Sequence, residues 1–385
     1  MSMYDQSTFR LHTRKRGVTL IELMVAMAIS LVVLLAVGTV YFSTKRTYAV
    51  QDEFSRMQEN ALFAFQSLTQ DVSTAGYAGC NPVVNNLLNT TAANNGLFNF
   101  TDGVYGWDYT GTNPGTAYNI ATLTAAPVGN AGNWSDNLGQ GLHASIAGKV
   151  IPGTDVLVIN SSRELSALTP TANILPADTS IQFANPTLMF TGTVILLSDC
   201  NKSDLFMNSD APGDSTLSRA TACGGFLPCN KPGGAWSHEY KAADVRMFTT
   251  TSRAYFIGVG ANGEPALFRY NYDLGSAGAT PEELVDGVEN MQILYGEDLT
   301  GQPFTPTRYV TINNVTNLAN VVSVRISLLM RSSGELNRPV ATKPYLVGGT
   351  NAATAVSINP IADRRLRKVF TSTIVLRNKL VTGRS

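Results

Sequence analysis

The sequence predicts an α+β fold in which one long N-terminal α-helix packs on a β-rich head with a mostly antiparallel sheet and loop insertions. The helix is predicted because residues 18–75 contain no proline and a single glycine, Gly38. The head is predicted because the rest of the chain carries short runs rich in valine, isoleucine and aromatic residues, bounded by glycine, proline or asparagine. No period of 20–50 residues recurs, which excludes a solenoid or a propeller.

Length and composition limit the functions to consider. The chain has 385 residues, enough for two or three domains. Charged residues make up 15% and the formal net charge is zero, which excludes a polybasic nucleic-acid binder and an acidic disordered chain. The single long apolar run argues against a polytopic membrane protein. Four cysteines are too few for a disulfide-dense miniprotein.

The long helix starts with the pattern of a membrane span. Four basic residues stand between positions 10 and 16, and Glu22 is the only charged residue in the stretch 18–44 that follows. A run of about 20 apolar residues crosses a bilayer core as a helix. Basic residues directly before it predict a cytoplasmic N-terminus and an exported remainder.

Two simpler interpretations of this segment compete. A secretory signal cleaved after Ala28 fits the small residues Ala26 and Ala28, but the apolar run continues beyond them, where a signal peptide would turn polar. A plain single-pass anchor explains every residue except Glu22, whose carboxylate costs at least about 2.5 kcal/mol inside a membrane. A charge kept at this cost indicates a functional residue with a partner.

Residues 16–22, RGVTLIE, resemble the class III signal of type IV pilins. The resemblance implies that a prepilin peptidase cuts between Gly17 and Val18, removes residues 1–17 as a cytoplasmic leader and methylates the new N-terminus at Val18. It also implies that residues 18–44 form a transmembrane and filament-core helix. The Glu22 carboxylate would then pair with the N-terminal amine of a neighbouring subunit, and such heterologous contacts build open filaments.

From residue 45 the predicted helix becomes amphipathic. Apolar residues recur at steps of three or four, namely Phe54, Met57, Ala61, Leu62, Phe65, Leu68 and Val72. This stripe predicts that residues 45–79 pack on the head, residues 80–385, and that Gly76 and Gly79 end the helix. Gly38 indicates either local unwinding during filament formation or a small-residue packing site.

The head contains seven clear strand candidates. They are residues 155–160, 193–198, 254–259, 266–270, 291–295, 321–330 and 369–376. Residues 282–290 look like a short helix that leads into a strand. Residues 82–150 are rich in asparagine, glycine and threonine, and the stretches 85–96 and 110–119 look like loops.

Four segments of the head narrow the resemblance. Residues 75–80, 283–292, 324–329 and 366–373 resemble the PilW family of minor pilins, and two of these segments are more loosely similar to the smaller J-type minor pseudopilins of type II secretion. The resemblance implies a type IV pilin-like fold and a structural subunit without a cofactor. It would prime pilus assembly at or near the pilus tip, in support of twitching motility, adhesion or DNA uptake.

The resemblance also implies partners and a location. The partners would be other minor pilins, the major pilin, the prepilin peptidase, the inner-membrane assembly machinery and a tip adhesin, with DNA left open. The chain would first cross the bacterial inner membrane once, with its head in the periplasm, and later stand in the pilus at the cell surface.

Cys80, Cys200, Cys223 and Cys229 all follow the predicted membrane span, so they can oxidise in the periplasm. Four cysteines allow three pairings. We favour Cys223–Cys229, which closes a short loop, and Cys80–Cys200, which joins the end of the helix to a strand. A zinc site lacks support, because there is no C-x-x-C motif and the two histidines outside the leader, His143 and His238, are not in ligand spacing.

Catalytic motifs are nearly absent, so we expect no enzyme, and a membrane-tethered periplasmic enzyme is the alternative from another functional class. Residues 213–215 (GDS) are similar to the nucleophile block of GDSL hydrolases but fit a turn better. No P-loop and no dinucleotide-binding motif occurs. Four aspartates miss the EF-hand spacing and are expected in surface loops, namely Asp199, Asp204, Asp210 and Asp214.

The C-terminal region carries a run of basic residues. They are Arg364, Arg365, Arg367, Lys368, Arg377, Lys379 and Arg384. We favour a charged edge on a terminal strand, which discourages edge-to-edge pairing between molecules. The alternative is a patch for DNA or for an acidic partner pilin.

Overall fold

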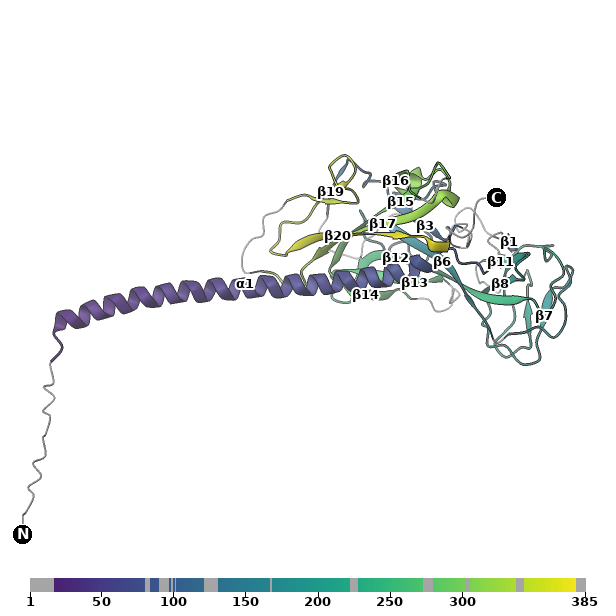
Figure 1. Ribbon diagram of the computed structural model, residues 1–385, viewed down its shortest axis with the longest axis horizontal. Coiled ribbons are helices and arrows are strands. Elements are labelled where there is room, and N and C mark those ends of the chain that lie inside the picture. The colour runs from purple at the N-terminus through teal and green to yellow at the C-terminus, as the bar shows by residue number, and fades with distance from the viewer. Residues whose placement is uncertain are drawn as a thin grey trace, which may run out of the picture. The chain divides into compact units, whose positions relative to one another are not determined.

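The computed structural model describes residues 17–79, 84–89, 97, 100, 102–120, 131–166, 168–221, 228–272, 280–301, 305–336 and 343–378. The chain divides into two compact units, Met1–Asp52 and Glu53–Ser385. The first unit contains the N-terminal part of the long helix α1 (Leu20–Thr74), and the second contains the rest of α1 and the head (Figure 1). The predicted α+β class, a long N-terminal helix with a mostly antiparallel head, is confirmed.

The helix α1 runs without interruption, as the absence of proline predicts. In the second unit, α1 buries one face against the head, through Met57, Ala61, Ala64, Leu68, Asp71 and Val72. Phe54 and Phe65 are half-buried, whereas Leu62 is 71% exposed and does not belong to the buried stripe. Leu62 follows Ala61 by one residue, a turn of about 100° around the helix, which takes it off the buried face.

Glycine permits a close approach where the helix ends. Gly76 adopts a positive φ of 72°, which favours glycine, and its N–H donates to the Asn160 carbonyl at 2.8 Å. A Cβ on Gly103 would lie 2.5 Å from the main-chain nitrogen of Gly76, so a side chain there would force the two segments apart. These contacts fix the end of α1 on the strands of the head.

The largest sheet has nine strands in the order β1-β9-β8-β12-β6-β3-β5, with β13 and β14 continuing from β12. All its pairings are antiparallel except the one between β1 and β9. The strands are β1 (Val84–Asn86), β3 (Val104–Tyr109), β5 (Trp134–Ser135), β6 (Val156–Glu164), β8 (Val194–Ser198), β9 (Ser203–Met207), β12 (Arg246–Val259), β13 (Pro265–Asn271) and β14 (Glu282–Asp286).

A second, four-stranded sheet has the antiparallel order β16-β15-β17-β20. Its strands are β15 (Val288–Glu297), β16 (Arg308–Val310), β17 (Val321–Arg331) and β20 (Arg367–Val375). Helix α1 contacts both sheets: Asn60 Nδ2 donates to the Asp286 carbonyl of β14, and Lys368 of β20 lies over the Phe54 ring. Figure 1 shows β20 and β14 alongside the second half of α1.

Three small sheets complete the described part of the head. They pair β2 (Leu88–Asn89) with β11 (Cys229–Asn230) and β7 (Ser180–Gln182) with β10 (Thr216–Ser218). In the third, β19 (Val356–Asn359) lies between β18 (Tyr345–Val347) and β4 (Ala117–Asn119). Short 3-10 helices cover Ala131–Asn133, Ile312–Asn314 and Leu318–Asn320. The main hydrophobic core joins α1 to both large sheets, and a separate core is formed by Leu87 and by residues between 165 and 247.

All seven strand candidates form strands or parts of strands, but two other expectations are wrong. Residues 282–290 are not a short helix: they form β14, the turn at Gly287 (φ 77°) and the start of β15. Pairing with β13 overrides the local helix propensity there. The stretches 85–96 and 110–119 are not wholly loops, because β2, β4 and part of β1 lie in them, and the buried strand β3 lies in the same asparagine-rich region.

Candidate functional site

The N-terminal motif lies at the start of α1. Gly17, Val18 and Thr19 precede the helix, and Val18 is 72% exposed. A Cβ on Gly17 would meet nothing within 4 Å. The bond between Gly17 and Val18 is therefore accessible in the non-helical segment before the first helical turn, which suits a site of proteolytic processing.

Glu22 contacts Thr19, which is an arrangement that our sequence reasoning missed. The Thr19 N–H donates to Glu22 Oε2 at 2.9 Å, the Thr19 hydroxyl donates to the same oxygen at 3.0 Å, and the Glu22 N–H donates to Thr19 Oγ1 at 3.3 Å. These reciprocal bonds form a capping box, which satisfies main-chain N–H groups at a helix start. The signal in the sequence is the Thr-x-x-Glu spacing directly before an apolar run.

The first half of α1 is apolar on all sides. Leu20–Thr74 contains a stretch with mean hydropathy 2.8, none of it buried, and by length and composition the helix can cross a membrane. A Cβ on Gly38 would also meet nothing within 4 Å, so within this chain the glycine serves no close packing contact. A helix that is hydrophobic all round needs lipid or other helices around it.

The C-terminal basic run does not form a free cationic patch within the described residues. Arg367 contacts Glu289 at 2.6 Å and Asp363 at 2.6 Å, and its side chain is only 3% exposed. Arg365 binds Glu264 at 2.8 Å, and Arg364 binds Glu335 at 2.7 Å near the surface. Lys379 and Arg384 lie outside the described residues.

Arg331 of the neighbouring strand β17 completes this ion-pair network. It contacts Glu264 and lies 3.5 Å from Glu289. Burial, together with the nearby Arg365 and Arg367, lowers the pKa of Arg331 to about 10, so it stays charged at neutral pH. The arginines therefore serve mainly to hold β20 and β17 to the carboxylates of the head, which disfavours the DNA patch.

The described cysteines agree with an oxidised head. Cys200 and Cys229 each take part in a disulfide bond. Their predicted partners, Cys80 and Cys223, lie outside the described residues, so the pairing stays a prediction. Cys200 has a φ of 71° in the turn between β8 and β9, where Asp199 Oδ1 accepts from the N–H groups that follow.

A serine, a histidine and two aspartates come together near the same turn. His238 Nε2 lies 2.7 Å from Asp199 Oδ2, and Ser237 Oγ lies 3.4 Å from His238 Nδ1. However, the Ser237 hydroxyl donates to Asp204 Oδ2 at 2.8 Å instead of to the histidine. A nucleophilic serine directs its proton to the base, so we interpret this grouping as an anchor for the loop.

Asp204 does not lie in a surface loop, and that expectation is wrong. It is fully buried in β9 and accepts from Asn85, Ser237 and Tyr240. The GDS sequence forms a turn as expected, with Gly213 at φ 102° and the Asp214 carboxylate accepting from the Ala211 N–H. The described residues hold no group of three or more histidine, cysteine or acidic side chains that could bind a metal ion.

Two family models match the chain. The prokaryotic N-terminal methylation motif matches residues 12–38, and the type IV pilus-assembly protein W (PilW) model matches residues 254–378. Over these residues the chain is similar to the PilW minor pilins of the type IV pilus. The first match contains the processing motif and the start of α1, and the second covers the strands from the end of β12 to β20. No curated protein and no solved structure matches the chain.

The two matches indicate the class of protein. The matched PilW family consists of structural pilus-assembly proteins, and this family implies interaction with other pilins and with the pilus assembly machinery. The apolar helix and class III signal of this chain are those of a membrane-anchored, pilus-associated protein. The sequence resemblance to minor pilins is therefore confirmed.

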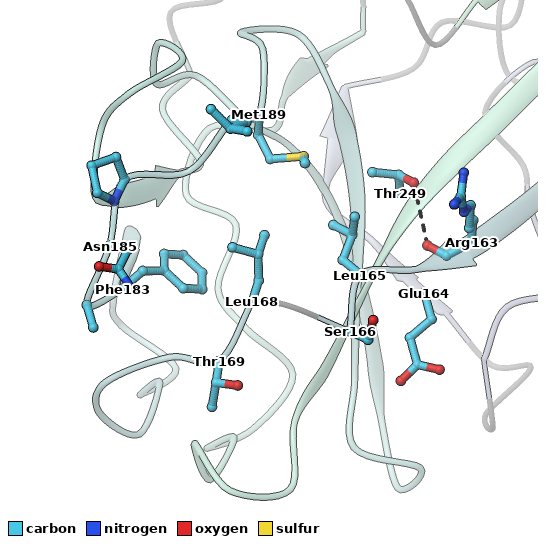
Figure 2. A pocket seen from close by; sticks show the side chains of 13 residues that line it. Arg163, Glu164, Leu165, Ser166, Leu168, Thr169, Phe183, Asn185, Met189 and Thr249 are labelled. Atoms are coloured by element: carbon cyan, nitrogen blue, oxygen red, sulfur yellow. Dashed lines mark hydrogen bonds between the residues drawn. The ribbon is translucent and has the colours of Figure 1, made fainter.

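This pilin also has a pocket outside the matched region. Leu165, Leu168, Phe183 and Met189 are among the residues that line it (Figure 2). The pocket has a volume of about 620 Å³, and its lining includes Leu188, which is 79% exposed. It belongs to the part of the head that the PilW model does not cover.

Proposed function

We propose that this pilin primes assembly of the pilus and stays at or near its tip, and that pairing of Glu22 with the N-terminal amine of a neighbouring pilin incorporates it. The observation that carries the proposal is the place of Glu22, one carboxylate in the otherwise uncharged stretch 18–44. Cleavage after Gly17 leaves the matching positive charge, an amine at Val18, on each processed subunit. The two charges attract strongly where lipid excludes water.

The capping box supports this role because it leaves part of the carboxylate available. Both Thr19 donors bind Oε2 of Glu22, and among the described residues no hydrogen bond uses Oε1. Thr19 thus orients the side chain at the helix start before a partner arrives. An ammonium group then forms a charge-assisted hydrogen bond, about twice as strong as one between neutral groups.

The size of the head supports a position at the tip. The second unit spans Glu53–Ser385, far more chain than the helix alone. Heads of this size would crowd each other along a repetitive shaft. In this proposal the N-terminus is cytoplasmic and the head is periplasmic before assembly. In the pilus, the neighbours of this subunit are other minor pilins, the major pilin and a tip adhesin. The pilus serves twitching motility, adhesion or DNA uptake.

Mass spectrometry of the mature protein tests the processing step. We expect an N-terminus at Val18 that carries a methyl group, because the bond before it is exposed and follows the basic leader. An N-terminus at Met1 or after Ala28 would contradict the proposal.

The variant Glu22→Ala tests the assembly role. We expect the variant to remain in the membrane, because its apolar helix is intact, and to lose pilus priming. The matched control is Glu59→Ala, which removes an exposed carboxylate from the second half of α1 and should leave piliation unchanged. Normal piliation with Glu22→Ala would refute the assembly role, and loss of protein secretion with normal pili on deletion would instead identify a pseudopilin.

A further inference from the structure

Strand β20 is an edge strand of the four-stranded sheet. Within the described residues it pairs with β17 alone. Two flanking hydrogen bonds show which residues of β20 bond to β17: the Leu376 N–H donates to the Val322 carbonyl, and the Ser332 N–H donates to the Leu366 carbonyl. Antiparallel pairs alternate between hydrogen-bonded and non-hydrogen-bonded residues. The even-numbered residues of β20 therefore bond to β17, and the main-chain N–H and C=O groups of Val369, Thr371, Thr373 and Val375 point away from it.

This edge lacks the charges that normally protect an edge strand. Arg367 is buried in its ion pairs with Glu289 and Asp363, and the Lys368 ammonium lies over the rings of Phe54 and Phe370. The remaining stretch, residues 369–376, reads VFTSTIVL and contains neither a charge nor a proline. Thr371 and Thr373 are exposed, and Val375 is 46% exposed. An uncharged strand of high β-propensity with free main-chain groups is a template for another strand.

The edge also follows the axis of α1. Lys368 lies 4.6 Å from the centre of the Phe54 ring, and Asn378 Nδ2 donates to the Ala75 carbonyl at 3.0 Å. The first contact lies near the start of β20 and in the head-bound half of α1, and the second lies just after the end of both elements, so β20 and this half of α1 run side by side in the same direction. A strand added to β20 would thus lie along the helix that carries the assembly contact.

We propose that β20 accepts a β-strand from the head of a neighbouring pilin subunit of a different kind. The β20 strands of two copies of this chain do not pair with each other. An antiparallel pair of β20 strands would make the two Glu53–Thr74 helical segments run in opposite directions. Subunits anchored in one membrane instead have helices that run in the same direction from the membrane to the head. In a symmetric parallel pair, each outward-facing residue of one β20 strand would lie opposite the same residue of the other. A parallel ladder instead needs the bonding residues of the two strands to be offset by one position, so the symmetric pair cannot form.

The partner strand has defined chemistry. It presents its own free N–H and C=O groups over about four residues, and small or β-branched side chains opposite Thr371 and Thr373. This inference rests on the proposed function, because it names the surface through which the minor pilin contacts its neighbour.

Hydrogen exchange resolved to single amides tests the proposal on the full chain, purified in detergent alone and co-purified with the other minor pilins. In the chain alone, the amides of Phe370, Ser372 and Ile374 should be protected and those of Thr371 and Thr373 should exchange freely. In the complex, exchange at Thr371 and Thr373 should slow by at least about tenfold, because both amides gain an acceptor. Co-purification with unchanged exchange there would overturn this proposal alone, whereas failure to co-purify would overturn the proposed function as well.

Proline variants provide the second test. Thr371→Pro and Thr373→Pro each remove an outward N–H without breaking the ladder to β17, and we expect complex formation to be lost. The matched variants Thr371→Val and Thr373→Val keep the N–H and should retain the complex. Protection of the Phe370 and Ser372 amides shows that each variant is folded. A folded proline variant that still forms the complex would refute strand addition.

Discussion

Arg367 lies in a run of basic residues that local sequence places at the surface, yet its side chain is only 3% exposed. It binds Glu289, which is 2% exposed, and Asp363. The hydrogen bonds and charges of these two carboxylates outweigh burial and raise the pKa of Arg367. A buried ion pair of this kind contributes little net stability, but removing one partner leaves the other charge without compensation.

We predict that Arg367→Met destabilises the protein by about 3–5 kcal/mol, because Glu289 would remain buried without its main partner. The control Arg364→Met removes a pair that is 53% and 44% exposed and should cost less than about 1 kcal/mol. Urea unfolding of the full chain in detergent measures both. Equal effects of the two variants would contradict the assigned difference in burial.

A buried pair of carboxyl groups makes stability depend on pH. Asp108 of β3 is hydrogen-bonded to Asp155, which precedes β6, and Asn313 Nδ2 donates to Asp108 at 3.1 Å. Burial raises the pKa of Asp108 to about 7, although the hydrogen bonds with Asp155 and Asn313 act to lower it. Burial and the nearby charge of Asp108 both raise the pKa of Asp155. The folded state therefore holds a proton that the unfolded chain releases above about pH 4.

We predict that this pair contributes stability below about pH 4 that is lost as pH rises to about 7, since the folded state binds the extra proton. Asp108→Asn keeps a donor next to Asp155 and removes the shared proton. The variant should gain stability relative to the parent as pH rises from 4 to 7. Thermal unfolding across this range measures the difference, and a difference that is constant with pH would disprove the assignment.

At the scale of single elements, the second half of α1 is held by a polar contact as well as by its apolar stripe. Asp71 is 7% exposed and accepts from Arg253 Nη1 at 2.7 Å and from the Tyr255 hydroxyl at 2.5 Å. Periodicity predicts the apolar face of α1 but cannot identify this carboxylate as buried. Its partners come from β12, more than 180 residues away in the sequence.

We predict that Asp71→Ala costs about 3 kcal/mol and exposes the last turns of α1, because Arg253 and Tyr255 lose their common acceptor. Hydrogen exchange of the amides in the last three turns of α1 measures the local opening. The control Glu59→Ala, on the exposed face, should leave exchange unchanged. Unchanged exchange in Asp71→Ala would mean that the apolar stripe alone holds the helix.

At the scale of the whole molecule, the head combines a family-specific part with an added lobe. The PilW match covers residues 254–378 and thus the entire four-stranded sheet, whereas the second hydrophobic core, built around Phe206, Trp236 and Tyr240, lies before it. Strand β12 takes part in both, since Met247 belongs to the second core and Tyr255 to the main one. A long continuous strand therefore joins the lobe to the rest of the head.

The predicted disulfides would tie this lobe to the end of α1. We predict that peptide mapping without reduction yields Cys80 linked to Cys200 and Cys223 linked to Cys229. In the chain-entropy model, closing the Cys80–Cys200 loop stabilises the fold by about 5 kcal/mol and closing the Cys223–Cys229 loop by about 2 kcal/mol, so Cys80→Ser should lower the unfolding midpoint more than Cys223→Ser. Recovery of either of the other two pairings would replace the assignment.

Local sequence by itself determined the parts of this protein whose signals are short-range. The uninterrupted helix, its apolar first half, the processing motif around Gly17 and the seven main strands follow from periodicity, from proline and glycine positions and from a seven-residue motif. These features depend on neighbours a few residues apart, so no knowledge of the folded chain is needed to predict them.

Only the tertiary structure decided which polar groups are buried and which strand lies at the edge of the four-stranded sheet. Residues 282–286 form a strand because β13 pairs with them, Asp204 is buried because Asn85 and Tyr240 surround it, and Arg367 leaves the strand edge uncharged because Glu289 binds it. Each outcome depends on partners that are distant in the sequence. These groups come together through burial and strand register, and a local sequence pattern specifies neither of the two.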